Sequence, residues 1–194
     1  MRIDAIVLAG GAATRFGGDK LAAVIDGETV LGRSVAMARR LGDRVVVVVG
    51  PGDPDPGLDG VTLARDAVPH RGPLAGLLTG LEALPGADLV LVVAGDMPEA
   101  SPAVLGLLLG ALHGDASLAV AHLESEPVAT LPFAARAATV LPAARRLLDA
   151  DRRSLRALLD TVPAMVVPAA EWRALDPDGR TLVDIDTPGD LPRG

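Results

Sequence analysis

The residues best able to do chemistry lie in one stretch near the N-terminus, LAGGAATRFGGDK (8–20). The stretch contains four glycines, Arg15 and Lys20, which is the only lysine of the chain. Glycines let an anion approach backbone N–H groups closely, and the two cationic side chains supply the charge that a triphosphate requires. The pattern therefore favours a phosphate-binding loop. The alternative is a glycine-rich surface turn that carries a solvated lysine.

Two common phosphate-binding motifs do not match this stretch. The P-loop requires Gly-Lys-Ser/Thr, whereas Lys20 stands between Asp19 and Leu21. The dinucleotide motif requires G-x-G-x-x-G, whereas five residues other than glycine follow Gly11. A phosphate loop here must therefore be of another kind.

Short β-branched runs alternate along the chain with longer stretches of helical pattern. Several of the runs are apolar throughout, which predicts strands covered on both faces, as in a mainly parallel sheet. We expect a three-layer, Rossmann-like α/β fold in a single domain, residues 1–194. The expected strands are 3–10, 44–50, 61–65, 88–96, 117–123, 127–132 and 163–168, and the expected helices are 28–41, 73–84, 102–112, 134–148 and 153–161.

Composition and charge exclude several classes of function. The formal net charge of −7 argues against a protein that binds nucleic acid or an anionic membrane through a broad basic surface. The absence of cysteine excludes disulfides, thiol catalysis and thiolate metal sites. The most apolar stretch, residues 102–112, is too short to span a bilayer, and the N-terminus has no signal-peptide pattern. We therefore expect a cytoplasmic protein.

The glycine-rich stretch resembles a motif of the nucleotidyltransferases of the sugar-nucleotide and molybdenum-cofactor group, LAGG-x-x-x-R-x-G-x-D-K. The match is closest to the molybdenum cofactor guanylyltransferase family. This resemblance implies a nucleotidyltransferase fold and the Mg²⁺-dependent transfer of GMP from GTP to molybdopterin, with release of pyrophosphate. It also implies that Arg15 and Lys20 act in catalysis. All fixed positions of the motif are present: Leu8, Ala9, Gly10, Gly11, Arg15, Gly17, Asp19 and Lys20. Of these, the resemblance places Leu8, Ala9, Gly10, Gly11 and Lys20 at the nucleotide.

Candidate aspartates lie within two further segments that resemble the family. Asp96 comes at the end of the apolar run 88–96, where a parallel sheet places its ligands. The resemblance implies that Asp96 binds the nucleotide and Mg²⁺, whereas the alternative role is a helix cap near Ser101. Asp184 and Asp186 lie two residues apart, which on a strand would put them on one face. The resemblance makes Asp186 a second candidate metal ligand, and the alternative is a polar strand edge that leads into a cap at Thr187.

The nucleoside contacts rest on the resemblance of RDAVPHRGPLAGLLTGLEAL (65–84) to a family segment. It implies that Asp66 and Gly76 contact the nucleotide, although Asp66 could also be a loop residue in solvent. The family carries an asparagine after its second strand, where this chain has GPGD (50–53), and the chain has no Asn or Gln at all. Base recognition must therefore use backbone groups or carboxylates. A carboxylate would accept hydrogen bonds from N1–H and the amino group of guanine.

The second half of the chain resembles the acceptor-binding half of the family. We expect the nucleotide-binding half at about 1–100 and the acceptor-binding half at about 101–194. An arginine cluster could attract an anionic acceptor or simply cover helix surfaces: Arg145, Arg146, Arg152, Arg153 and Arg156. The implied partners are GTP, molybdopterin or the molybdenum cofactor, and molybdoenzyme chaperones. The alternatives are a CTP-using cytidylyltransferase, another nucleotidyltransferase, or a non-catalytic GTP-binding protein.

Overall fold

In the computed structural model, which describes residues 1–10, 19–66 and 72–191, seven strands form one sheet. Their order across the sheet is β5-β4-β1-β6-β8-β7-β9. Strand β8 runs antiparallel to both of its neighbours, and the other adjacent pairs are parallel. The predicted mainly parallel sheet is confirmed. The strands are β1 (Ile3–Leu8), β4 (Val45–Val49), β5 (Thr62–Arg65), β6 (Leu89–Ala94), β7 (Val120–Leu123), β8 (Phe133–Arg136) and β9 (Ala164–Val167).

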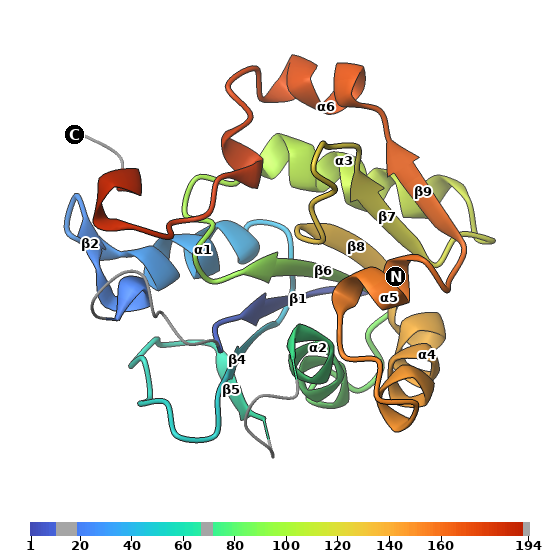
Figure 1. Ribbon diagram of the computed structural model, residues 1–194, viewed down its shortest axis with the longest axis horizontal. Helices are drawn as coiled ribbons and strands as arrows, with labels where there is room; N and C mark the ends of the chain where they lie inside the picture. The colour runs from blue at the N-terminus through green and yellow to red at the C-terminus, as the bar shows by residue number, and fades with distance from the viewer. Residues whose placement is uncertain (11–18, 67–71, 192–194) are drawn as a thin grey trace.

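Helices cover both faces of the sheet and complete the three layers. Helices α1 (Val30–Ala38), α3 (Pro102–Gly114) and α6 (Ala169–Leu175) cover one face, and α2 (Pro73–Glu82), α4 (Ala137–Asp149) and α5 (Leu155–Leu159) cover the other (Figure 1). A separate hydrophobic cluster lies beneath each layer. The central strands β4 and β6 are buried almost throughout, as expected for strands with helices on both sides. The predicted three-layer α/β fold is confirmed.

The sequence interpretation is wrong around the antiparallel strand. Residues 127–132 are not a strand, because Pro127 and Pro132 have no N–H to donate to a ladder. The strand is instead β8, whose alanines have high helix propensity and therefore fall inside the predicted helix 134–148. Pairing with β6 and β7 overrides that propensity. Helix α6 is likewise absent from the prediction, and its Trp172 is fully buried.

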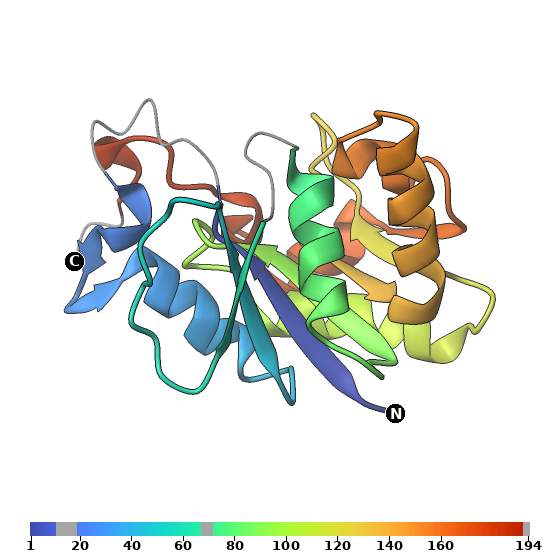
Figure 2. The same ribbon diagram turned by 90° about the horizontal axis from the view of Figure 1, so that it is seen from below.

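The C-terminal segment returns to the carboxyl edge of the sheet. It contains two short 3₁₀ turns, η2 (Arg180–Leu182) and η3 (Pro188–Asp190), and it lies beside α1 and the small hairpin of β2 (Val24–Ile25) and β3 (Glu28–Thr29) (Figures 1 and 2). Ile185 packs there in a small cluster with Ile25 and Val30. The expected strand at Asp184 and Asp186 is wrong, because this segment is irregular. Its backbone contacts the turn after β6 through a hydrogen bond from Ile185 N–H to the carbonyl of Asp96, and not through a ladder.

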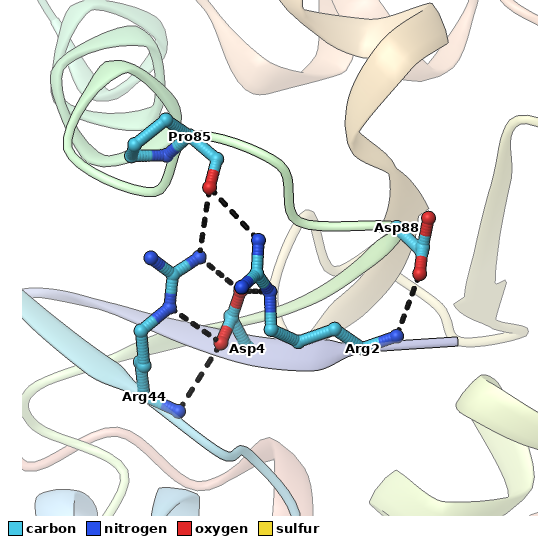
Figure 3. Close-up of polar contacts among 5 residues, drawn as sticks. All are labelled: Arg2, Asp4, Arg44, Pro85 and Asp88. Atoms are coloured by element: carbon cyan, nitrogen blue, oxygen red, sulfur yellow. Dashed lines mark hydrogen bonds and ion pairs between the residues drawn. The ribbon is translucent and has the colours of Figure 1, made fainter.

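An ion cluster closes the opposite, amino end of β1. The Asp4 side chain is fully buried and accepts hydrogen bonds from Arg44 Nε at 3.1 Å and Nη2 at 2.7 Å. Arg2 Nε lies 3.5 Å from the same carboxylate, and both arginines donate to the carbonyl of Pro85 (Figure 3). The hydrogen bond that Arg44 donates to Asp4 is the main cause that raises the pKa of Arg44, with burial opposing it. This cluster, Arg2–Asp4–Arg44, ties β1 to β4 far from the carboxyl edge.

Candidate functional site

A cleft of about 680 Å³ opens along the carboxyl edge of the sheet. Ligands of open α/β sheets bind at this edge, because the strands end there and the following loops can shape a site. The cleft wall comes from the ends of β1, β4 and β6 together with the loops that follow them. The residues that line it are Leu8, Ala9, Gly10, Asp19, Lys20, Leu21, Ala22, Thr29, Leu31, Val49, Asp53, Pro54, Asp55, Pro56, Pro73, Ala94, Asp96 and Leu131.

Lys20 is the centre of the charged end of this cleft. It opens the short 3₁₀ turn η1 (Lys20–Ala22), which Asp19 caps by accepting a hydrogen bond from Leu21 N–H at 3.0 Å. The Lys20 ammonium lies 2.5 Å from Asp96 Oδ2 and 3.2 Å from Asp186 Oδ1. The side chains of Lys20 and Asp96 are each 18% exposed, so a ligand could still reach both. Three segments distant in the sequence therefore meet at one cationic nitrogen.

Backbone contacts hold Asp186 beside Asp96. The Ile185 N–H donates to the Asp96 carbonyl at 3.0 Å, and the buried Ile185 side chain anchors the same point of the segment. On the other side, Asp190 Oδ2 accepts hydrogen bonds from the N–H groups of Asp186 at 3.1 Å and Thr187 at 2.6 Å. The position of the Asp186 carboxylate is thus set by the turn that follows it as well as by the strand end that it faces.

The charges at this end of the cleft do not balance. Asp184 is a third carboxylate here, and burial of its carboxyl, together with the nearby charges of Asp96 and Asp186, raises its pKa to about 6 although the residue keeps an exposed surface. Burial opposes the charge of Lys20, but its hydrogen bond and attraction to Asp96, followed by those to Asp186, raise its pKa overall. One ammonium therefore faces three carboxyl groups. This end of the cleft has more acidic than basic side chains and would attract a further cation.

The donor set is compatible with a divalent cation. Within residues 1–10, 19–66 and 72–191, no group of three His, Asp or Glu side chains has the geometry of a complete metal site. Asp96 and Asp186 nevertheless both contact the single Lys20 ammonium, so carboxylate oxygens already converge on one cationic position. Mg²⁺ and Mn²⁺ prefer oxygen ligands, and Mg²⁺ is usually held by one or two carboxylates together with water and phosphate.

The other end of the cleft is built from the turn after β4. Asp53 Oδ2 accepts a hydrogen bond from Gly50 N–H at 2.8 Å, and Arg65 Nη1 from β5 donates to the Asp53 carbonyl at 2.5 Å. Gly10 lies against the same turn, since a Cβ there would come within 3.1 Å of Gly50 N. The sequence indicates only a surface turn at 52–57. The structure makes residues 53–56 a wall of the cleft.

The predicted site residues divide into three groups. Five of them line the cleft: Leu8, Ala9, Gly10, Lys20 and Asp96. Asp186 joins them through its contact with Lys20. Gly11 and Arg15 lie outside the described residues.

Asp66 and Gly76 lie beside each other but do not belong to the described lining of the cleft. The Asp66 carboxylate accepts a hydrogen bond from Thr79 Oγ1 at 2.7 Å, and a Cβ on Gly76 would approach its other oxygen at 3.7 Å. The Asp66 side chain thus binds the helix that covers β4 and β1.

Sequence reasoning missed Thr29, Leu31 and Leu131 as cleft residues. Thr29 could have been found as the N-cap of α1, since its Oγ1 accepts from Gly32 N–H at 2.9 Å. Nothing local marks Leu131, which reaches the cleft only because β8 folds back next to β6.

The arginine cluster of the second half is partly neutralised by neighbouring acids. Arg145 pairs with Glu82, Arg153 with Asp151 and Arg156 with Asp160. Arg156 also lines a second cavity, of about 330 Å³, with His122, whose pKa is lowered mainly by burial. Arg145, Arg146 and Arg156 lie on helices α4 and α5, whereas Arg152 and Arg153 lie in the loop between these helices.

Comparison with known proteins places the chain in a family. Residues 5–166 match the model of the MobA-like NTP transferase domain. A protein of Chloroflexus aggregans named probable molybdenum cofactor guanylyltransferase is 33% identical over 196 residues, which cover 98% of this chain and 92% of that protein.

Two solved structures show the same fold. A molybdopterin-guanine dinucleotide biosynthesis protein A from Archaeoglobus fulgidus has a TM-score of 0.78 and 20% identity, with 97% of this chain and 94% of that chain covered. A Mycobacterium tuberculosis protein, solved as a complex with manganese, has a TM-score of 0.64 and 21% identity, with 87% and 89% covered. At such identities the likeness concerns the fold alone. The match of the family model and the near full-length relatives carry the assignment: this chain belongs to the MobA-like NTP transferase family and is a nucleotidyltransferase.

Proposed function

We propose that this chain transfers GMP from GTP to molybdopterin or the molybdenum cofactor and releases pyrophosphate. The observation that carries the proposal is the meeting of Lys20, Asp96 and Asp186 at one end of a cleft on the carboxyl edge of the sheet. The choice of GTP and of the acceptor is supported by the names of two near full-length relatives, a probable molybdenum cofactor guanylyltransferase and a molybdenum cofactor guanylyltransferase.

The triphosphate would lie at the charged end of the cleft. Lys20 would exchange part of its contact with Asp96 for phosphate oxygens, and the N–H groups of the glycine-rich segment that follows Leu8 would approach the same oxygens. We assign Arg15 and Gly11 to this region from the motif alone. Leu8, Ala9 and Gly10 would form the floor beneath the nucleotide, because they line the cleft where β1 ends. Asp66 and Gly76 would lie behind the residues that line the cleft and would hold those residues in position to contact the nucleoside.

Asp96 and Asp186 are the residues that would hold Mg²⁺. When bound, the ion would neutralise charge on the phosphates of the nucleotide. The manganese complex of the Mycobacterium tuberculosis protein shows that a protein of this fold takes a divalent cation.

The reaction requires positioning and charge stabilisation more than proton transfer. An anionic phosphate oxygen of the acceptor would attack the α-phosphorus, a new P–O bond would form, and the bond to the bridging oxygen would break as pyrophosphate leaves. Because the attacking oxygen is already anionic, no general base is needed. Lys20 and Arg15 would stabilise the negative charge that spreads over the phosphates in the transition state.

The second half of the chain would bind the acceptor. We propose the division at about residue 100, with molybdopterin entering from the side of Leu131 and Pro73, which line the cleft next to the acceptor half. Molybdoenzyme chaperones as partners and a cytoplasmic location remain predictions of the sequence. No helix in the described part of the chain is long and apolar enough to cross a membrane.

The test is Mg²⁺-dependent release of pyrophosphate with molybdopterin as acceptor, comparing GTP, CTP, ATP and UTP. Release with GTP alone, and its loss in Asp96→Ala, would support the proposal. A preference for CTP would make the protein a cytidylyltransferase. Tight GTP binding without release, with either molybdopterin or its molybdenum-loaded form, would contradict the catalytic function.

A further inference from the structure

We infer that Asp53 recognises the base of the nucleotide and selects guanine. This inference rests on the proposed function, because it assigns the base contact of the same cleft. The chain contains no side-chain amide, so the contact must come from a group of another type. Asp53 is a carboxylate that lines the cleft at the end away from Lys20.

The order of the strands places Asp53 at the correct separation from the phosphates. Asp96 follows β6 and the Asp53 turn follows β4, with β1 between the two strands. Adjacent strands are about 4.8 Å apart, so the ends of β4 and β6 lie roughly 10 Å apart. That separation suits a nucleoside, whose phosphate end would lie at Lys20 and Asp96. The base would then reach the turn that carries Asp53.

The chemistry of a carboxylate matches guanine and no other common base. Guanine presents two neighbouring donors, N1–H and the exocyclic amino group, and an ionised carboxylate is a double acceptor. The pairing edges of adenine and cytosine each put an acceptor nitrogen beside the amino group, and uracil puts its one N–H between two carbonyl oxygens. A carboxylate opposite any of these three bases would face at least one acceptor, which is unfavourable.

The Asp53 carboxylate is held in place before any ligand binds. Its Oδ2 accepts the Gly50 N–H at 2.8 Å, and Arg65 fixes the backbone of the same residue by donating to its carbonyl at 2.5 Å. The side chain lies directly over Gly50, since a Cβ there would meet Oδ2 at 2.8 Å. Each carboxylate oxygen can accept more than one hydrogen bond, so the Gly50 contact still leaves capacity for the base.

Asp55 is the competing carboxylate in the same loop. It also lines the cleft, but it is exposed and its Oδ1 accepts a hydrogen bond from Gly57 N–H at 2.8 Å, farther along the loop. Asp53 is partly buried and is tied both to the end of β4 and to β5. The geometry therefore favours Asp53.

The experiment compares GTP with ITP, whose base keeps N1–H but lacks the amino group. In wild-type protein we expect GTP to exceed ITP in kcat/KM and in binding affinity by about 10- to 100-fold, the range for a hydrogen bond to a charged group. In Asp53→Asn this ratio should fall close to one, because the amide can keep the Gly50 contact while losing the negative acceptor. Binding is measured by titration calorimetry, so the comparison does not depend on turnover.

Three further variants separate recognition from folding. Gly50→Ala should also lower the GTP to ITP ratio, because the added Cβ would displace the Asp53 carboxylate. The nearest atoms to that Cβ all belong to the Asp53 side chain, so the fold should persist. Asp59→Asn removes the same charge from an exposed position of the loop outside the cleft lining and should leave the ratio unchanged. A shift of the ratio in Asp55→Asn, with none in Asp53→Asn, would overturn the assignment.

The outcome for the wild-type protein distinguishes the two proposals. If wild-type protein uses GTP and Asp53→Asn keeps the full GTP to ITP ratio, this inference fails and the proposed function stands. If wild-type protein does not bind GTP, or prefers CTP, both fail together.

Discussion

Two ion clusters at opposite edges of the sheet differ in the balance of their charges. At the amino end of β1, one carboxylate, Asp4, meets two arginines and is fully buried. At the carboxyl edge, one ammonium, Lys20, meets Asp96 and Asp186 and lies near Asp184, and the Asp186 side chain is 55% exposed. The first cluster has all of its negative charge compensated by protein. The second has more acid than base and is open to a ligand.

The difference has a physical basis in desolvation. A buried carboxylate is tolerated only when cations and hydrogen bonds compensate it. Asp4 accepts hydrogen bonds from Arg44 and forms an ion pair with Arg2 at 3.5 Å. In the second cluster, burial of the Asp184 carboxyl, together with the nearby charges of Asp96 and Asp186, raises its pKa to about 6. Under the proposed function, a bound cation would compensate this excess of acid. The comparison thus supports a structural role for the first cluster and the proposed binding role for the second.

The largest effect is expected for Lys20→Ala. Loss of a group that stabilises charge in the transition state typically lowers turnover by about 10²–10³-fold. The fold should persist, since Lys20 belongs to a short turn that is held by Asp19. The rate of pyrophosphate release measures turnover, and circular dichroism shows whether the variant is folded. The surface variant Arg39→Ala is the control, and near wild-type turnover in folded Lys20→Ala would show that the charged end of the cleft is not catalytic.

A smaller effect, on stability and not on chemistry, is expected for Asp4→Asn. The substitution keeps the size of the side chain but removes the charge from several hydrogen bonds, so the free energy of unfolding should fall by about 1–3 kcal/mol. Turnover of the folded protein should be unchanged, because Asp4 lies at the opposite edge. Chemical denaturation measures the change, with exposed Asp59→Asn as the control. A loss of turnover without a loss of stability would contradict the purely structural role given to the Asp4 cluster.

The smallest of these effects is expected for Asp190→Asn, which tests how the site is held. Hydrogen bonds from Thr187 and Asp186 lower the pKa of Asp190, so its contribution to the turn is present above pH 3.8 and is lost as the pH falls through the lowered value. The variant should weaken the position of Asp186 and reduce turnover several-fold, less than Lys20→Ala does.

The decisive measurement for Asp190→Asn is the Mg²⁺ concentration that gives half-maximal rate. It should rise in this variant and stay unchanged in the exposed control Asp178→Asn. Equal values for both variants would show that the turn does not position Asp186 for the proposed metal binding.

Local pattern was sufficient for much of the fold. The unbroken apolar runs at 44–50 and 88–96 predict buried parallel strands, and β4 and β6 lie within them. Prolines at the first helical position mark the beginnings of α2 and α3. These features depend on neighbours in the sequence, so composition and spacing reveal them.

Features that depend on distant partners were not predictable in this way. Residues 133–136 have a helical composition and become a strand only because β6 and β7 supply hydrogen-bond partners. The turn at Asp53 becomes a cleft wall only because β4 ends next to β1, and Leu131 reaches the cleft only through the return of β8.

The sequence by itself determined the types of chemical group, namely a single lysine in a glycine-rich segment, a carboxylate after a buried strand and two aspartates near the C-terminus. Tertiary structure alone decided that these groups meet. Asp186 reaches Lys20 through one backbone hydrogen bond to Asp96 and the burial of Ile185, neither of which leaves a periodic pattern in the sequence. Periodicity reports which face of an element is buried, whereas contacts between residues 76 and 166 positions apart depend on how the elements pack.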